Sequence, residues 1–256
     1  MKILRVNENN FKAIDDNRRE IGSCRICRRD LSRVFPDCPI HYFMDVQCEP
    51  EAEDLLYSAG LTRGRQLTKT DGRCGVYVRV PAERRELVQS LREQGLKSRD
   101  GLRRMVREVT AEPVRCVLPR GCTIVRDRLE NSIEFTNCLN RYNECFGTRN
   151  SENWLKNIAA RPDFTRSVIV AEDGLCGELL AWRSGDRGVI GVVQTARQWR
   201  QKGIATYLLE DARMYFTRLG LACMTMEVRC MAPGSMELAT AAGFVNDRVL
   251  YYYLEL

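Results

Sequence analysis

A basic turn that contains a glycine lies between an apolar run and a helical pattern in the last third of the chain. The segment VIGVVQTARQWRQKGIATYLLEDARMYFTRLG spans residues 189–220. Its first part is rich in β-branched residues, which predicts a strand. Its last part repeats apolar residues at helical spacing from Ile204 to Leu219, and Gly220 follows where a helix C-cap belongs. The pattern predicts a strand, a turn and an amphipathic helix that opens at residues 200–206.

The turn RQKGIAT predicts an anion site. The first backbone N–H groups of a helix have no partner within the helix, and the helix dipole places about half a positive charge at that end. Gly203 and Ala205 allow a ligand to approach the main chain closely, and Arg200 and Lys202 add charge at the rim. The alternative is a solvated turn with a structural glycine, because one short glycine pattern is a weak signal.

The remaining elements of the second half predict a mixed sheet. Turn residues between three apolar runs indicate an antiparallel meander before the basic turn. We place a domain boundary near residue 112, where the periodicity weakens, giving domains 1–112 and 113–256. The strands expected in the second domain are 114–121, 167–172, 177–183, 189–195, 222–228 and 247–256, and its helices are 129–147, 151–162, 204–219 and 235–243.

The first 112 residues predict a smaller α/β domain. The charged stretch 9–34 is interpreted as a solvent-exposed helix interrupted near Gly22, and strands at 40–48 and 75–80 alternate with helices at 50–60 and 81–95. A weak internal echo pairs MDVQC at 44–48 with MEVRC at 226–230, each before a helix. A degenerate half-copy of the second domain is therefore one interpretation of the first.

The residues from 113 to 256 resemble the GNAT superfamily of N-acetyltransferases. The resemblance rests on Val193-x-Thr195 followed by WRQKGIAT, on the MEVR strand, and on LATAAGF, which ends at Gly243-Phe244. It implies an α/β (α+β) fold with a mixed, mostly antiparallel sheet flanked by helices. It also implies direct transfer of an acetyl group from acetyl-CoA, as co-substrate, to a primary amine of a small molecule or peptide.

The resemblance also implies which residues bind CoA. Main-chain groups of Val193, Gln194 and Thr195 would hold the pantetheine, and the amides of residues 201–206 the pyrophosphate. Ser235 is available where the family often has Asn near the start of the second-motif helix, since Ala232 occupies the aligned position. The full candidate set is Val193, Gln194, Thr195, Arg200, Gln201, Lys202, Gly203, Ile204, Ala205, Thr206 and Ser235.

The general acid and base are less defined by the sequence. The family often places a Tyr in its second motif as the acid, but Ala239 stands there. Tyr252, with its neighbours Tyr251 and Tyr253, is the candidate acid, unless the run is only a closing strand and solvent supplies the proton. Glu178 and Glu227 are the candidate bases, with a solvated strand face as the alternative for each.

Cysteine and histidine spacing raises a zinc site as a second interpretation. Cys24-x-x-Cys27 and Cys38-x-x-His41 have the form of a Cys3His set. Twelve cysteines make a chance C-x-x-C frequent, and no knuckle glycines accompany this one. We therefore expect no metal, and treat these cysteines as small core residues.

Composition limits the partners. The net charge of +6 is spread along the chain, which gives no support for nucleic-acid binding. No segment has the roughly 18 consecutive apolar residues of a membrane span. We expect a cytoplasmic monomer or homodimer whose partners are acyl-CoA and an amine. A non-catalytic acyl-CoA sensor is the alternative function, and a zinc-dependent interaction protein is the third.

Overall fold

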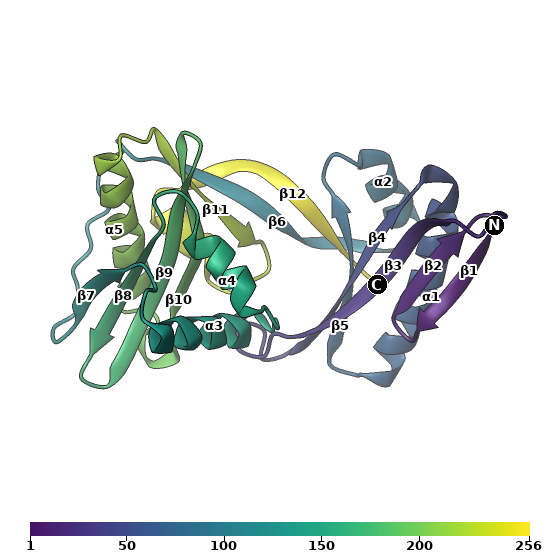
Figure 1. Ribbon diagram of the computed structural model, residues 1–256, viewed down its shortest axis with the longest axis horizontal. Coiled ribbons are helices and arrows are strands. Elements are labelled where there is room, and N and C mark those ends of the chain that lie inside the picture. The colour runs from purple at the N-terminus through teal and green to yellow at the C-terminus, as the bar shows by residue number, and fades with distance from the viewer. The chain divides into compact units, whose positions relative to one another are not determined.

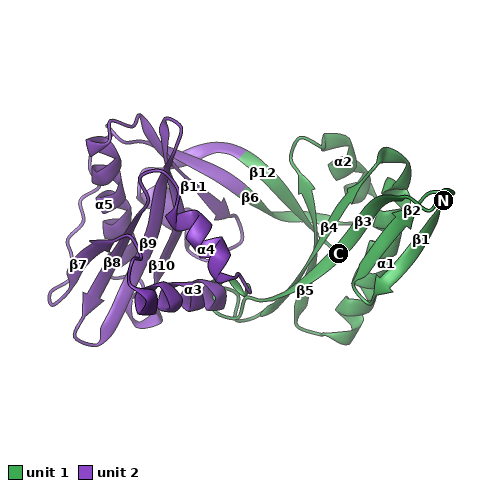
Figure 2. Cartoon of the chain, viewed as in Figure 1, with its two compact units in different colours: residues 1–102, 146–148, 249–256 green, residues 103–145, 149–248 purple.

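The computed structural model describes residues 1–256 as two compact units (Figure 2). The first contains residues 1–102, 146–148 and 249–256, and the second contains 103–145 and 149–248. Each unit has its own helices and buried core. Strands β6 (Lys97–Glu108) and β12 (Val245–Glu255) each contribute residues to both units.

The first unit has strand order β1-β2-β3-β4-β5-β12. Strands β1 to β4 form an antiparallel meander, whereas β4 and β5 are parallel because helix α1 connects them. Helix α1 covers the face that carries Met44, Val76 and Val78. The elements are β1 (Lys2–Asn7), β2 (Asn10–Ile14), β3 (Glu20–Asp30), β4 (Ile40–Cys48), η1 (Pro50–Ala52), α1 (Glu53–Thr70), β5 (Cys74–Pro81) and α2 (Arg85–Glu93).

The second unit has strand order β6-β11-β10-β9-β8-β7. Strands β7 to β10 are antiparallel, and β10 and β11 are parallel across helix α5. The elements are β7 (Thr123–Asp127), α3 (Ser132–Phe146), α4 (Glu152–Ala159), β8 (Thr165–Ala171), β9 (Gly174–Ser184), β10 (Arg187–Thr195), η2 (Arg197–Trp199), α5 (Ile204–Arg218), β11 (Cys223–Arg229) and α6 (Ser235–Ala241). The predicted mixed, mostly antiparallel sheet is therefore present.

Helices α3 and α5 cover opposite faces of the second sheet (Figure 1). Consecutive residues of a strand point to opposite faces. On β9, Gly177 lies against Ile204 of α5, so that a Cβ there would come within 2.5 Å of it. The next residue, Glu178, contacts Arg141 of α3. The sheet thus separates the helix that follows the basic turn from the helix that binds Glu178.

The predicted helix over 9–34 is wrong, because this segment forms β2 and β3. Cys24 and Ile26 are both buried in the core of the first unit, which is the two-residue period of a strand. Arg25 between them is exposed, and the exposed charged residues 28–30 that follow conceal that period in the sequence. Arg18, at φ 64°, lies in the turn that joins the two strands.

Three further elements differ from the prediction. The strand expected at 114–121 is absent, and β7 begins only at Thr123. Strands β1 and β6 were not predicted at all. Strand β6 has seven charged residues among its twelve, KSRDGLRRMVRE, and its buried positions are Asp100, Gly101, Met105 and Arg107. A strand with this many charged residues has no alternating pattern of apolar residues by which it could be predicted from the sequence.

The two units share an order of elements. Strand β4 is followed by α1, β5, α2 and β6, and strand β10 by α5, β11, α6 and β12. The internal echo had paired residues of β4 with residues of β11, whereas the parallel pairs match β4 with β10 and β5 with β11. The domain assignment 1–112 and 113–256 stays a proposal, and the common order supports only the interpretation of the first domain as a degenerate copy.

Candidate functional site

Strands β10 and β11 separate in front of the basic turn. Their parallel pairs run from Arg187 with Cys223 to Ile190 with Met226 and end there. Strand β10 continues to Thr195, paired only with β9, after a shift of register between Ile190 and Val192. The main chain of residues 193–195 is therefore left open on its β11 side.

The turn after β10 presents a row of unpaired amides. The N–H of Ala196 binds the carbonyl of Cys176, and a short 3-10 helix follows. Gln201 and Gly203 then adopt left-handed conformations, with φ 61° and 80°, before α5 begins. No protein acceptor is present for the amides from Gln201 to Thr206, and the first helical bond is that of Tyr207 N–H to the carbonyl of Gly203.

The residues of this turn fit a diphosphate. A Cβ on Gly203 would have no atom within 4 Å, so the space in front of it is open. Lys202 holds its ammonium 4.5 Å from the centre of the Trp199 ring. The indole Nε1 of Trp199 is buried without an acceptor in the protein, which is costly by about 1–3 kcal/mol unless an outside group accepts. Unpaired N–H groups, positive charge and open space coincide here.

Glu178 is a poor candidate base. It is fully buried, and its two oxygens accept from Arg141 Nε at 3.0 Å and Nη2 at 2.9 Å, from Arg166 Nε, and from Gln194 Nε2 at 2.8 Å. Burial alone raises the pKa of this carboxyl, but the hydrogen bonds and charges of Arg141 and Arg166 together hold the pKa below its ordinary value. A saturated carboxylate with a lowered pKa positions its neighbours and accepts a proton poorly.

Glu227 is placed better for proton transfer. It is the residue after Met226, the last partner of β10, so it stands where the strands begin to separate. Its side chain is 52% exposed, and the only ion pair is a long one of 3.7 Å to Arg104. Glu227 has room for a water molecule or an amine, which Glu178 lacks.

The candidate acid Tyr252 belongs to the first unit. It pairs with Val80 of β5, and the guanidinium of Arg92 lies 5.4 Å from its ring centre. Its place in that sheet supports a closing strand, which was the alternative for the tyrosine run. Ala239 is fully buried in the core of the second unit, so its position faces α5 and the sheet. Ser235 is the first residue of α6.

The structure does not bring the four candidate zinc ligands together. Cys24 and Cys27 both lie on β3, and residues three apart on a strand point to opposite faces. His41 places its Nε2 2.9 Å from the carbonyl of Cys38, and its ring lies between Phe35 and Tyr77. No group of three metal-binding side chains is formed anywhere in the chain.

Arg141 and Arg166 were missed by sequence reasoning. They contact Glu178 from positions 37 and 12 residues away, and Arg166 also binds Asp127 at 2.7 Å and Glu134 at 2.9 Å. The chain has many arginines, so nothing in the sequence marks these two. Only the packing of α3 against β8 and β9 brings them together.

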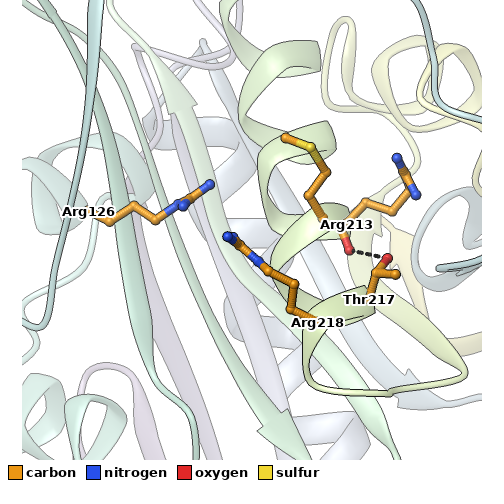
Figure 3. Close-up of a pocket in the computed structure, with 5 residues that line it drawn as sticks. Arg126, Arg213, Thr217 and Arg218 are labelled. Atoms are coloured by element: carbon orange, nitrogen blue, oxygen red, sulfur yellow. Dashed lines mark hydrogen bonds between the residues drawn. The ribbon is translucent and has the colours of Figure 1, made fainter.

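A second group of arginines lies near the C-terminal end of α5. A hollow of about 350 Å³ is lined by Arg126, Arg213, Met214, Thr217 and Arg218. Figure 3 shows Arg126 and Arg218 pointing toward one another, and Arg213 turned away. Arg126 binds Asp211, which is almost fully buried. The hollow lies beside the last turns of α5, at the end of the helix opposite to RQKGIAT.

Comparisons with known proteins identify the fold. Neither a protein-family profile nor a curated protein sequence matches the chain. A GCN5-related N-acetyltransferase from Sphaerobacter thermophilus is similar with a TM-score of 0.58 and 17% identity, over 98% of this chain and 81% of that one. A conserved protein of unknown function from Enterococcus faecalis V583 gives a TM-score of 0.62 and 12% identity, over 96% and 61%.

A tandem GNAT protein from the clavulanic acid biosynthesis pathway is also similar, with a TM-score of 0.52 and 11% identity over 96% of this chain and 82% of that one. The chain therefore has the fold of the GCN5-related N-acetyltransferases, which confirms the fold expected from the resemblance. The helices of the structure include none with the length and apolar character needed to cross a membrane.

Proposed function

We propose that the chain transfers an acetyl or other acyl group from CoA to a primary amine of a small molecule or peptide. The observation that carries this proposal is the row of unpaired amides from Gln201 to Thr206 beside the open end of β10. A helix start of this kind binds phosphate groups. The fold of the similar structures supports the same reading.

Each part of the site has a role in this proposal. The amides of residues 201–206 bind the pyrophosphate of acetyl-CoA, the co-substrate, with Arg200 and Lys202 at the rim. The main chain of residues 193–195 binds the pantetheine arm. Bound in this way, acetyl-CoA supplies an activated thioester. Ser235, at the start of α6, is the remaining polar group proposed for CoA.

Glu227 is the proposed base. It removes a proton from the ammonium of the acceptor, directly or through one water molecule, so that the neutral amine can attack. No side chain is assigned as the acid, because Ala239 is in the core and Tyr252 is in the first unit. A thiol has an ordinary pKa of about 8.5, so the departing thiolate needs little help near neutral pH.

The setting and partners are proposals as well. An amine and acyl-CoA are the partners, without nucleic acid, metal or membrane, and the chain acts as a monomer or homodimer. Twelve free cysteines support a reducing, cytoplasmic location.

A matched pair of glycine variants tests CoA binding. Gly203 and Gly220 lie at opposite ends of α5, both have positive φ, and a Cβ added at either position would have no atom within 4 Å. Gly203→Asp adds a carboxylate among the amides, so we expect CoA affinity in calorimetry to fall at least about tenfold. Gly220→Asp adds the same charge and strain elsewhere and should retain affinity. Equal loss in both variants would contradict the site.

A non-catalytic acyl-CoA sensor is the second candidate function. The burial of Ala239 favours it, because the position of the family's usual acid offers no reacting group. Incubation of the chain with acetyl-CoA and a broad panel of amines, with release of free thiol measured, separates the two. Tight CoA binding without any thiol release would favour the sensor.

A further inference from the structure

Arg141 has a free hydrogen-bonding edge. Its Nε and Nη2 bind the two oxygens of Glu178 at 3.0 and 2.9 Å, which uses one side of the planar guanidinium. The two hydrogens of Nη1 and the second hydrogen of Nη2 have no partner in the protein. A guanidinium has five donors in a fixed plane, so one unused hydrogen on each of Nη1 and Nη2 forms a second edge.

This edge belongs to the face of the sheet opposite α5. Glu178 accepts from Arg141 and also from Gln194 Nε2, and Gln194 lies on β10 beyond its last pair with β11. The carboxylate of Glu178 therefore bridges Arg141 and Gln194, which lies on the part of β10 proposed to hold the thioester. An amine that attacks from the α3 side would pass this guanidinium.

Of the two arginines that bind Glu178, Arg141 is the one that reaches solvent. The side chain of Arg166 is 2% exposed, and its donors bind Glu178, Asp127 and Glu134. The side chain of Arg141 is 26% exposed and binds Glu178 alone. Because Glu178 stays ionised and holds one edge, the guanidinium is already ordered, so a ligand would not have to restrict it further.

Resting on the proposed function, we infer that Arg141 binds a carboxylate of the acceptor, so that the acceptor is an amino acid or a peptide with a free α-carboxylate. Two parallel N–H groups of a guanidinium edge match the two oxygens of a carboxylate. One free edge suits one carboxylate group. Arg141 is thus a specificity-determining residue, and the amine is the group acetylated.

Matched acceptors test this inference. Amino acids with a free carboxylate and the same amino acids as carboxamides are compared as acceptors by thiol release from acetyl-CoA. In the unaltered chain we expect the carboxylate form to have a KM at least about tenfold lower than the amide, since a charge-assisted hydrogen-bond pair is worth that much. Equal KM values for the two forms would overturn the inference.

Variants separate binding from a purely structural role. Arg141→Gln should raise the KM for carboxylates about tenfold or more, leave the KM for amides unchanged and change kcat little. Arg126→Gln is the control, because Arg126 also binds a buried carboxylate, Asp211, through two nitrogens. It should keep the preference for carboxylates. Arg141→Lys, which keeps the charge, should retain only part of that preference, and full retention in all three variants would contradict the role of Arg141.

Failure of this inference is distinguishable from failure of the proposed function. If no amine releases thiol, transfer is disproved, and the carboxylate site is then measured by calorimetry in the presence of CoA. N-acetylated amino acids are titrated against their carboxamides. Preference for the carboxylate, lost in Arg141→Gln, would support the site without turnover, and equal heats would overturn it.

Discussion

The two units have the same strand–helix–strand connection, but the turns between the strand and the helix carry opposite charges. In the first unit β4 and β5 are parallel up to Met44 and Val78, and in the second β10 and β11 up to Ile190 and Met226. The turn before α1 reads EPEAED at 49–54, whereas the turn before α5 reads RQKGIA at 200–205. Four acidic residues thus stand where the second unit has two basic ones.

The acidic turn is also closed by the protein itself. Pro50 has no N–H to offer, and Arg84 binds Glu53 through both terminal nitrogens, at 2.6 and 2.8 Å. Arg19 binds Glu49 at 2.9 Å. In the first unit the N–H of Ala52 binds the carbonyl of Glu49 and the N–H of Glu53 binds that of Pro50, whereas the amides of residues 201–206 have no acceptor in the protein. The two units thus share parallel strands and a crossover helix but differ in the residues of the turn, and we propose an anion site only at the turn of the second unit.

The largest expected difference between the units concerns their ion pairs. Arg166 is buried and binds three carboxylates, whereas the Arg84–Glu53 pair is partly exposed. Removing one partner of a buried ion pair leaves an uncompensated charge, so Arg166→Ala should lower the free energy of unfolding by about 3–5 kcal/mol. Arg84→Ala should lower it by about 1 kcal/mol or less.

Chemical denaturation followed by two signals measures this. All three tryptophans, Trp154, Trp182 and Trp199, lie in the second unit, so their fluorescence follows that unit alone, while circular dichroism follows both. Arg166→Ala should shift the fluorescence transition, and Arg84→Ala should not. Equal losses of unfolding free energy in the two variants would mean that the network around Glu178 stabilises the fold no more than an exposed ion pair does.

The second prediction reverses the charge of the basic turn. The double variant Arg200→Glu and Lys202→Glu gives the second unit the charge pattern of the first. Two reversed charges beside a bound diphosphate should weaken CoA binding about a hundredfold, as measured by calorimetry. The unaltered chain should bind one CoA, through the second unit only.

Two CoA molecules per unaltered chain would break the comparison, because the acidic turn would then bind as well. Arg218→Gln is the control for net charge. It removes a cation from the hollow at the other end of α5 and should leave CoA affinity unchanged (Figure 3).

The sequence predicted the second unit better than the first, for physical reasons. Strands β8 to β10 and helix α5 are buried, so their apolar periods are clear and their turns carry Gly and Asp. Strands β1 and β3 are partly exposed, and charged residues between buried ones hide the two-residue period. An exposed strand and an exposed helix look alike when polar residues fill most positions.

The candidate site divides in the same way. The turn proposed to bind CoA could be singled out from the sequence because its donors are main-chain groups contiguous in sequence, from Gln201 to Thr206. Side-chain chemistry could not be found, because Arg141 and Glu178 come from separate elements, and a burial pattern does not show which ionised partners meet. Glu178 therefore became a candidate base in the sequence, although its pKa is lowered by those partners.

The third prediction concerns the loss of stability in acid, and its expected size is the smallest of the three. The folded chain holds the pKa of Glu178 below its ordinary value, because hydrogen bonds and charges from Arg141 and Arg166 together outweigh burial. The unfolded chain, with an ordinary pKa of about 4.3, binds this proton more readily. The ionised carboxylate therefore stabilises the fold above about pH 5, and this contribution is lost as the pH falls through the unfolded and then the folded pKa.

Comparison with Glu178→Gln isolates this group from the other carboxylates. The gap in unfolding free energy between the unaltered chain and the variant should be largest near pH 7 and should shrink as the pH falls from 5 toward 3. In the first unit the carboxyls of Asp16 and Asp30, whose pKa values are also lowered by hydrogen bonds, are exposed, so their replacement by Asn should leave the pH profile almost unchanged. A gap that widens on acidification would mean that burial raises the pKa of Glu178, and Glu178 would again be a candidate base.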